Sequence, residues 1–149
     1  MTIVVDANIV FSGILNSNGK IGDLLINAAD VMSFIAPEFL KTEIRKHYFR
    51  LSKISNLTAE EVIDAEYRVC KNIRFISEEQ IKKSNWLAAE KLVEDIDAKD
   101  VQYVAFAKQF KCKIWSGDKL LMKGLAKKRF MAFIDTETLF IFWQKRIAK

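Results

Sequence analysis

Short apolar runs rich in β-branched residues alternate along this chain with segments of helical periodicity, and this alternation constrains the fold more than any other feature. The runs occupy residues 3–5, 33–36, 74–76, 113–116 and 131–134. Continuous apolar strands are typical of a parallel sheet that is covered on both faces. Strands that alternate with helices favour a doubly wound α/β sheet.

Apolar residues recur at helical spacing between these runs. They predict helices over 21–29, 39–51, 58–70, 85–93 and 98–110 and a terminal helix around 139–143. Pro37 suits the first turn of the helix over 39–51, and Thr58 with Glu61 forms a capping box at the start of the next one. The 149 residues contain no low-complexity linker, so we expect a single domain spanning 1–149.

Composition excludes several classes of protein. Half of the residues are apolar, 29% are charged, and proline and glycine are sparse, which excludes disordered and collagen-like chains. Cys70 and Cys112 have no metal-ligand spacing and read as reduced thiols. The sequence shows neither a signal-peptide pattern nor an apolar run long enough for a membrane span, so we expect a cytoplasmic protein with no membrane association.

Charge is unevenly distributed along the chain. The net charge is +5, with basic residues concentrated in 41–53 and 119–149 and acidic residues in 90–100. A basic surface favours an anionic partner. The basic turn of Lys127, Lys128 and Arg129 is one expected contact for such a partner.

Acidic residues follow two of the predicted strands directly. Asp6, Ala7 and Asn8 come after the first strand, and Ser116, Gly117 and Asp118 end the fourth. In a doubly wound sheet, ligands bind beyond the carboxyl ends of the strands. Aspartate is also a favoured N-cap, so either residue alone is explained equally well by capping.

Three further acids bear on this choice. Asp97 and Asp100 stand three residues apart at the predicted start of a helix, where they either cap it or face a ligand. Glu43 falls inside the apolar stripe of its helix, and an inward carboxylate requires a cation, a proton or an ion pair with a nearby lysine.

A divalent cation would make a cluster of these carboxylates stable, because otherwise they repel one another. Oxygen ligands without a cysteine or histidine cluster favour Mg²⁺ or Mn²⁺. The single histidine, His47, excludes a three-histidine zinc centre and argues against a Ser-His-Asp triad.

These residues resemble the PIN domain family (PilT N-terminus-like), metal-dependent nucleases that include toxin-type ribonucleases. The resemblance rests on four blocks that run through most of the chain: Val4-Val5-Asp6-Ala7-Asn8, Pro37-Glu38-Phe39-Leu40 with Glu43, Asp97-Ala98-Lys99-Asp100, and Ile114-Trp115-Ser116-Gly117-Asp118-Lys119. Ser116 stands where the family more often has threonine. The resemblance implies a three-layer α/β/α sandwich whose five-stranded parallel sheet has the order 3-2-1-4-5.

The resemblance also implies roles for single residues. Catalytic acids would be Asp6, Glu43, Asp100 and Asp118; the metal ligands would be Asp6, Asp97, Asp100 and Asp118; and the substrate contacts would be Asn8, Ser116 and Lys119. The implied reaction is hydrolysis of RNA phosphodiester bonds with Mg²⁺ or Mn²⁺. Toxin-type relatives further imply a homodimer and an antitoxin protein as partners.

The alternative is a PIN-like scaffold that binds RNA or a protein without cutting. Two related enzyme classes fit less well, because a phosphoacceptor domain needs an aspartate where Ser77 stands and a haloacid-dehalogenase-type phosphatase needs one at Asn8. Trp115, Trp143 and Phe142 offer rings for base stacking, but their positions in a strand and an apolar stripe favour core packing.

Overall fold

A five-stranded parallel sheet forms the centre of the molecule. The computed structural model describes residues 1–148, apart from the side chain of residue 98, so Lys149, the end of the predicted domain, lies outside the described residues. The strand order is β3-β2-β1-β4-β5, as expected. The strands are β1 (Thr2–Val5), β2 (Ser33–Pro37), β3 (Ile73–Ile76), β4 (Lys113–Trp115) and β5 (Phe133–Ile134).

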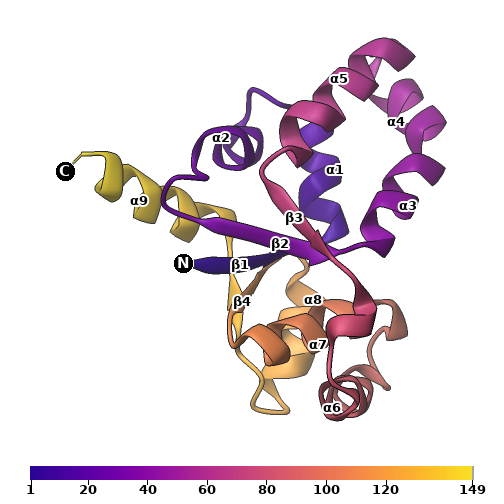
Figure 1. Ribbon diagram of the computed structural model, residues 1–149, viewed down its shortest axis with the longest axis vertical. Coiled ribbons are helices and arrows are strands. Elements are labelled where there is room, and N and C mark those ends of the chain that lie inside the picture. Colours follow the sequence, from indigo (N-terminus) through magenta and orange to yellow (C-terminus); the bar gives the residue numbers. More distant parts are fainter. Residues whose placement is uncertain (149) are drawn as a thin grey trace.

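Helices cover both faces of this sheet and complete the three-layer sandwich (Figure 1). One face carries α1 (Ala7–Leu15), α2 (Lys20–Asn27), α3 (Phe39–Lys46), α4 (Tyr48–Ser55), α5 (Ala59–Cys70) and α9 (Thr136–Ile147). The other carries α6 (Lys83–Val93), α7 (Val101–Phe110) and α8 (Lys119–Ala126). Short 3-10 turns, η1 (Glu78–Gln80) and η2 (Ala98–Asp100), precede α6 and α7. No helix in residues 1–148 is long and apolar enough to cross a bilayer.

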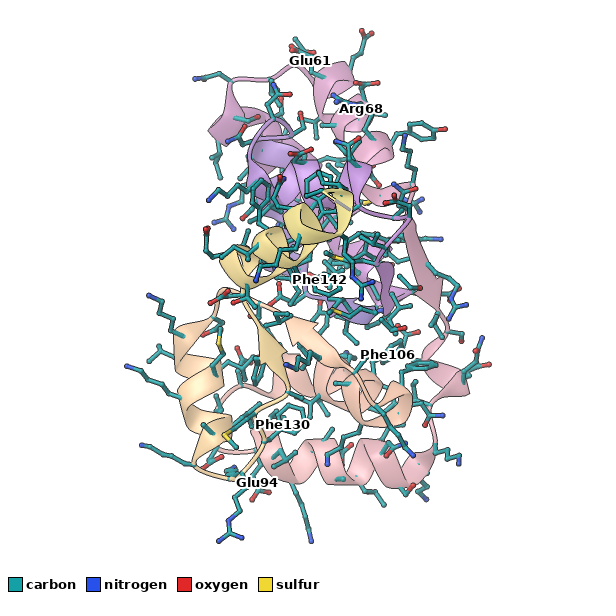
Figure 2. The ribbon with its side chains drawn as sticks, turned by 90° about the vertical axis from the view of Figure 1, so that its left-hand side faces the viewer. Glu61, Arg68, Glu94, Phe106, Phe130 and Phe142 are labelled. Atoms are coloured by element: carbon teal, nitrogen blue, oxygen red, sulfur yellow. The ribbon has the colours of Figure 1, made fainter. Side chains whose placement is uncertain are left out.

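The strands divide their side chains between two apolar cores. Val4, Ile35 and Ile114 pack beneath α6, α7 and α8, whereas their neighbours Ile3 and Phe34 pack against the opposite helices. This burial on both faces explains why the strands are continuous apolar runs. Figure 2 shows Phe106 in the lower half of the molecule, and it is fully buried there.

Trp115 and Trp143 belong to the core, as the sequence favoured. Trp115 is fully buried, and its indole N–H donates to Oγ1 of Thr136 at 3.0 Å. Trp143 is 7% exposed on α9. Neither ring is available as a stacking surface.

Two expectations about helix boundaries are wrong. Pro37 ends β2, paired with Ile76, and does not enter the following helix. Its missing N–H is tolerated because β2 is already past its last pair with β1, Val4 with Ile35. The predicted helix over 39–51 is two helices, since the N–H of His47 bonds back to Ile44 and closes α3.

Candidate active site

A cavity of about 520 Å³ opens at the carboxyl ends of the central strands. The residues that line it are mostly acidic or polar and come from four segments of the chain: Asp6, Ala7, Asn8, Phe11, Phe39, Glu43, Asp97, Lys99, Asp100, Gln102, Tyr103 and Asp118. Every predicted catalytic and metal-ligating acid is among them. The fold therefore gathers residues that are far apart in sequence at the edge where ligands bind in such sheets.

Asp6 is the innermost acid. It directly follows β1 and is 7% exposed, and its Oδ1 accepts the N–H of Ile9 at 3.0 Å, which caps α1. Burial raises the pKa of Asp6, and the nearby charge of Asp118 adds to this, while hydrogen bonds from Ser116, Ile9 and Asn8 oppose it. One carboxylate oxygen of Asp6 therefore caps α1, as one of the two interpretations predicted, while the same carboxyl group lines the cavity.

Asp118 repeats this arrangement after β4. Its Oδ1 accepts the N–H of Leu121 at 3.0 Å and caps α8. Ser116 joins the two acids, because its hydroxyl accepts the N–H of Asp118 at 3.0 Å and hydrogen-bonds to Asp6. Ser116 is only 1% exposed. Its placement differs from the predicted substrate contact, since the buried hydroxyl orients two acids instead.

Asp97 and Asp100 occupy the turn before α7 and have different surroundings. Asp97 is exposed, and its Oδ1 accepts the N–H of Lys99 at 2.9 Å. Asp100 occupies the N-cap position of α7, but its side chain makes no capping hydrogen bond. The hydrogen bond to Lys99 gives Asp97 the predicted capping role, whereas the Asp100 carboxylate has no such role.

The turn that carries Asp97 packs against α8 through the contact of Ile96 with Gly124. A Cβ on Gly124 would lie 2.7 Å from Cδ1 of Ile96, so any larger residue would make the Ile96 side chain shift. Ile96 packs against the core on that face. The acidic turn thus rests on an apolar contact that a larger residue at position 124 would displace.

Glu43 reaches the cavity from α3. The start of this helix is held by Glu78, whose Oε1 accepts the N–H of Phe39 at 2.8 Å. The Glu43 side chain is 33% exposed and lies 3.5 Å from Nζ of Lys46 and 3.8 Å from Nε2 of His47. The lysine pairing considered from the sequence is therefore present, although such exposed pairs on one helix contribute little free energy.

Mutual repulsion among the acids is expressed most strongly at Asp100. Burial and the negative charges of Asp97, Asp118 and Asp6 raise its pKa to about 6. Within residues 1–148, Glu43 alone among the cavity acids forms an ion pair with a basic side chain. The cavity therefore concentrates negative charge that its surroundings do not neutralise.

The donor set suits a hard divalent cation. Carboxylates of Asp6, Asp97, Asp100 and Asp118 and the amide of Asn8 offer only oxygen ligands of the kind Mg²⁺ and Mn²⁺ prefer. As placed, no three acid, histidine or cysteine side chains of the described residues lie close enough together to hold one ion. A cation held jointly by these carboxylates would therefore require their side chains to rotate toward one another.

Several cavity residues were missed by sequence reasoning. Phe11 and Phe39 form apolar walls, and Lys99 is the one lysine among the lining residues. Gln102 and Tyr103 follow Asp100 on α7, and their position one turn from an acid was the available signal. The predicted substrate contact Asn8 lines the cavity, whereas Lys119 is exposed at the start of α8 and outside the lining.

The basic turn after α8 has a structural role that the sequence did not indicate. The ammonium of Lys128 donates to the carbonyl of Leu92 at 2.8 Å and pairs with Asp95. It thereby closes the carboxyl end of α6. Lys127 and Arg129 remain exposed beside it.

Comparisons with known proteins agree with this architecture. The PIN domain family model matches residues 4–146. No curated protein matches the sequence. The crystal structure of PAE2754 from Pyrobaculum aerophilum is similar, with a TM-score of 0.68 and 12% sequence identity over 97% of this chain and 90% of that one. At this identity the structural similarity shows the fold alone.

Proposed function

Because the chain belongs to the PIN domain family, whose members are generally nucleases, we propose that it is a Mg²⁺- or Mn²⁺-dependent endoribonuclease. The observation that carries the proposal is the state of Asp100. This carboxylate caps no helix, and burial together with three neighbouring acids raises its pKa to about 6. A protein gains nothing in stability from such an arrangement, whereas a bound cation would use it.

The chain would hold the ion through Asp6, Asp97, Asp100 and Asp118. When bound, the ion supplies an activated water and stabilises charge on the scissile phosphate. Asp6 and Asp118 are kept in fixed orientations by their capping bonds and by Ser116. The Lys99 ammonium lies at the edge of the cavity, where it would attract a phosphate.

RNA is the substrate that we propose. The basic residues that give the chain its net charge of +5 supply sequence-independent affinity for phosphates. A second cavity of about 310 Å³ shares Asn8 and Phe11 with the acidic one and adds Leu15, His47, Arg50, Leu51 and Ile54. The Phe11 ring and the Arg50 charge within this largely apolar lining suit an unpaired nucleotide beside the cleaved bond.

Regulation and location complete the proposal. By family resemblance, the protein would act as the toxin of a toxin–antitoxin pair in the cytoplasm, as a homodimer and under the control of an antitoxin protein. These features rest on the resemblance and on no contact within the described residues.

A non-catalytic scaffold is the second candidate. Two observations favour it: the acids of the described residues do not form a compact ligand group, and Glu43 already has Lys46 beside it. Such a protein would bind RNA without consuming it. Cleavage, not binding, therefore separates the two functions.

Cleavage of a panel of labelled structured RNAs with Mn²⁺ tests the proposal. The purified protein should cut at least one RNA, and Asp100→Asn should lower the rate by about 100-fold or more. Asp30→Asn, which removes the same charge from an exposed residue outside the cavity, serves as the matched control and should cut normally. Binding without cleavage by the unaltered protein would establish the scaffold, and equal rates for Asp100→Asn and the parent would remove Asp100 from the mechanism.

A further inference from the structure

Tyr103 places a hydroxyl group in an unusual environment at the inner wall of the acidic cavity. The residue is 5% exposed and lines the cavity, and its Oη has no hydrogen-bond partner among the described residues. A buried hydroxyl without a partner is costly and calls for an explanation. The ring is held against Phe39, with centroids 5.8 Å apart, so the hydroxyl has little freedom to find a partner by itself.

The groups around this hydroxyl show what it faces. Burial and the negative charges of Asp6, Asp100 and Glu43 raise the pKa of Tyr103, so the phenol keeps its proton at neutral pH. The backbone N–H of Ala7 approaches the same oxygen, but it is also a donor and cannot accept the phenol's hydrogen. The O–H group therefore needs an acceptor. The amide oxygen of Gln102 also lines the cavity without a partner in the described part of the chain, but neighbouring residues on a helix do not face each other, and the charged groups that act on the hydroxyl are carboxylates.

Asp100 is the carboxylate that lacks a donor. Asp6 accepts hydrogen bonds from Ile9 and Ser116, whereas among the described residues Asp100 accepts none at its N-cap position. Asp100 and Tyr103 are three residues apart at the start of α7, a spacing that places side chains on one face. An unused donor and an unused acceptor thus line the same cavity from one helix face.

We infer that Tyr103 is a positioning residue whose hydroxyl donates to the Asp100 carboxylate when a divalent cation is bound. The inference rests on the metal site of the proposed function. Without a cation, Asp6 and Asp118 repel Asp100 and oppose its movement toward the inner wall. Positive charge in the cavity removes that repulsion, and the hydroxyl then fixes the carboxylate in a ligating orientation, as outer-shell partners of metal ligands do.

Calorimetric titration with Mn²⁺ tests this role without requiring RNA. Tyr103→Phe keeps the ring and removes only the hydroxyl, and it should raise the Kd for Mn²⁺ by about 10-fold. The metal-free melting temperature should not fall, because the hydroxyl that is removed has no partner. Tyr67→Phe, at a tyrosine that is 71% exposed, is the matched control and should leave the Kd unchanged.

The rate of RNA cleavage gives a second readout. The rate of Tyr103→Phe should recover toward that of the parent at saturating Mn²⁺, because a positioning residue changes the metal requirement and not the reaction. An equal Mn²⁺ affinity in Tyr103→Phe and the parent, or a lowered melting temperature of the metal-free variant, would overturn the inference alone. Absence of Mn²⁺ binding by the parent protein would overturn the proposed function and this inference together.

Ultraviolet difference spectra extend the test to proteins that retain Tyr103. Donation by a phenol shifts its absorption band to longer wavelength, so Mg²⁺ should produce this shift in the parent and in Tyr67→Phe. Absence of the shift in both the parent and Tyr67→Phe would contradict the inference. Loss of the shift in Tyr103→Phe would assign it to Tyr103.

Discussion

Replacing Asp100 by asparagine should stabilise the protein in the absence of metal while it removes the metal response. Asparagine has nearly the same shape, so the turn before α7 loses no packing. The carboxylate is a net cost to the metal-free fold, because burial and the charges of Asp97, Asp118 and Asp6 oppose its ionisation. Removing the charge therefore removes the repulsion.

The size of the effect follows from the pKa. A rise from 3.8 to about 6 corresponds to roughly 3 kcal/mol between the ionised and neutral forms. Because Asp100 is partly exposed and solvent screens its charge, we expect about 1 to 1.5 kcal/mol of stabilisation. For a chain of 149 residues this raises the melting temperature by about 3 to 5 °C.

The direction of the Asp100 pKa shift also determines how the stability difference depends on pH. An acid whose pKa is higher in the folded state than in the unfolded state binds its proton more tightly when folded, so folding is disfavoured as the pH rises through this interval. The difference between Asp100→Asn and the parent should be smallest near pH 4 and complete above about pH 6.

Thermal unfolding in EDTA at pH 4 and pH 7.5 measures this difference. Asp30→Asn serves as the control for the loss of one negative charge from a basic protein and should show no comparable gain. Added Mn²⁺ should raise the melting temperature of the parent strongly and that of Asp100→Asn weakly. A metal-free Asp100→Asn protein that melts below the parent at pH 7.5 would refute the electrostatic reasoning.

Further predictions concern the residues that support the site. Ser116→Ala should destabilise the protein by roughly 1 to 3 kcal/mol in chemical denaturation and weaken Mn²⁺ binding, because it removes the hydrogen bonds to Asp6 and Asp118, whereas Ser116→Thr should restore both. Lys128→Ala should lower the melting temperature by about 3 °C with cleavage unchanged, since its ammonium holds the end of α6. The double variant Lys127→Glu with Arg129→Glu should weaken RNA binding at low salt, and its difference from the parent should shrink as the salt concentration rises. Filter binding at several salt concentrations measures this, and an unchanged affinity at low salt would exclude a phosphate contact.

The alternation of strands and helices was sufficient to predict a doubly wound α/β sheet, because local apolar patterns reveal its elements, whereas the strand order came from the family resemblance. The capping box of Thr58 and Glu61 is present at the start of α5 as expected. The boundaries at Pro37 and His47 were wrong for different reasons. Pro37 pairs with Ile76 in the sheet, and periodicity along one segment contains no information about such a partner. The break at His47 is a local backbone turn closed by its N–H to Ile44, and the apolar periodicity continues across it.

The aspartates of the cavity were predictable because each stands at the end of a strand or the start of a helix, and Glu43 was predictable because it falls inside the apolar stripe of its helix. Their supporting residues were not. Ser116 is a buried link between Asp6 and Asp118, and Lys128 closes a helix more than thirty residues away. Tyr103 reads in the sequence as an ordinary core residue, and only the packing of its ring against Phe39 places its hydroxyl among carboxylates.

The capping bonds of Asp6 and Asp118 have an evolutionary consequence. Each of these aspartates would still begin a helix in a descendant that had lost the proposed cleavage activity, so selection for folding alone would preserve it. Asp100 would have no such protection, and its loss would even strengthen the fold. Position 100 is therefore where decay to an inert lineage should first be visible.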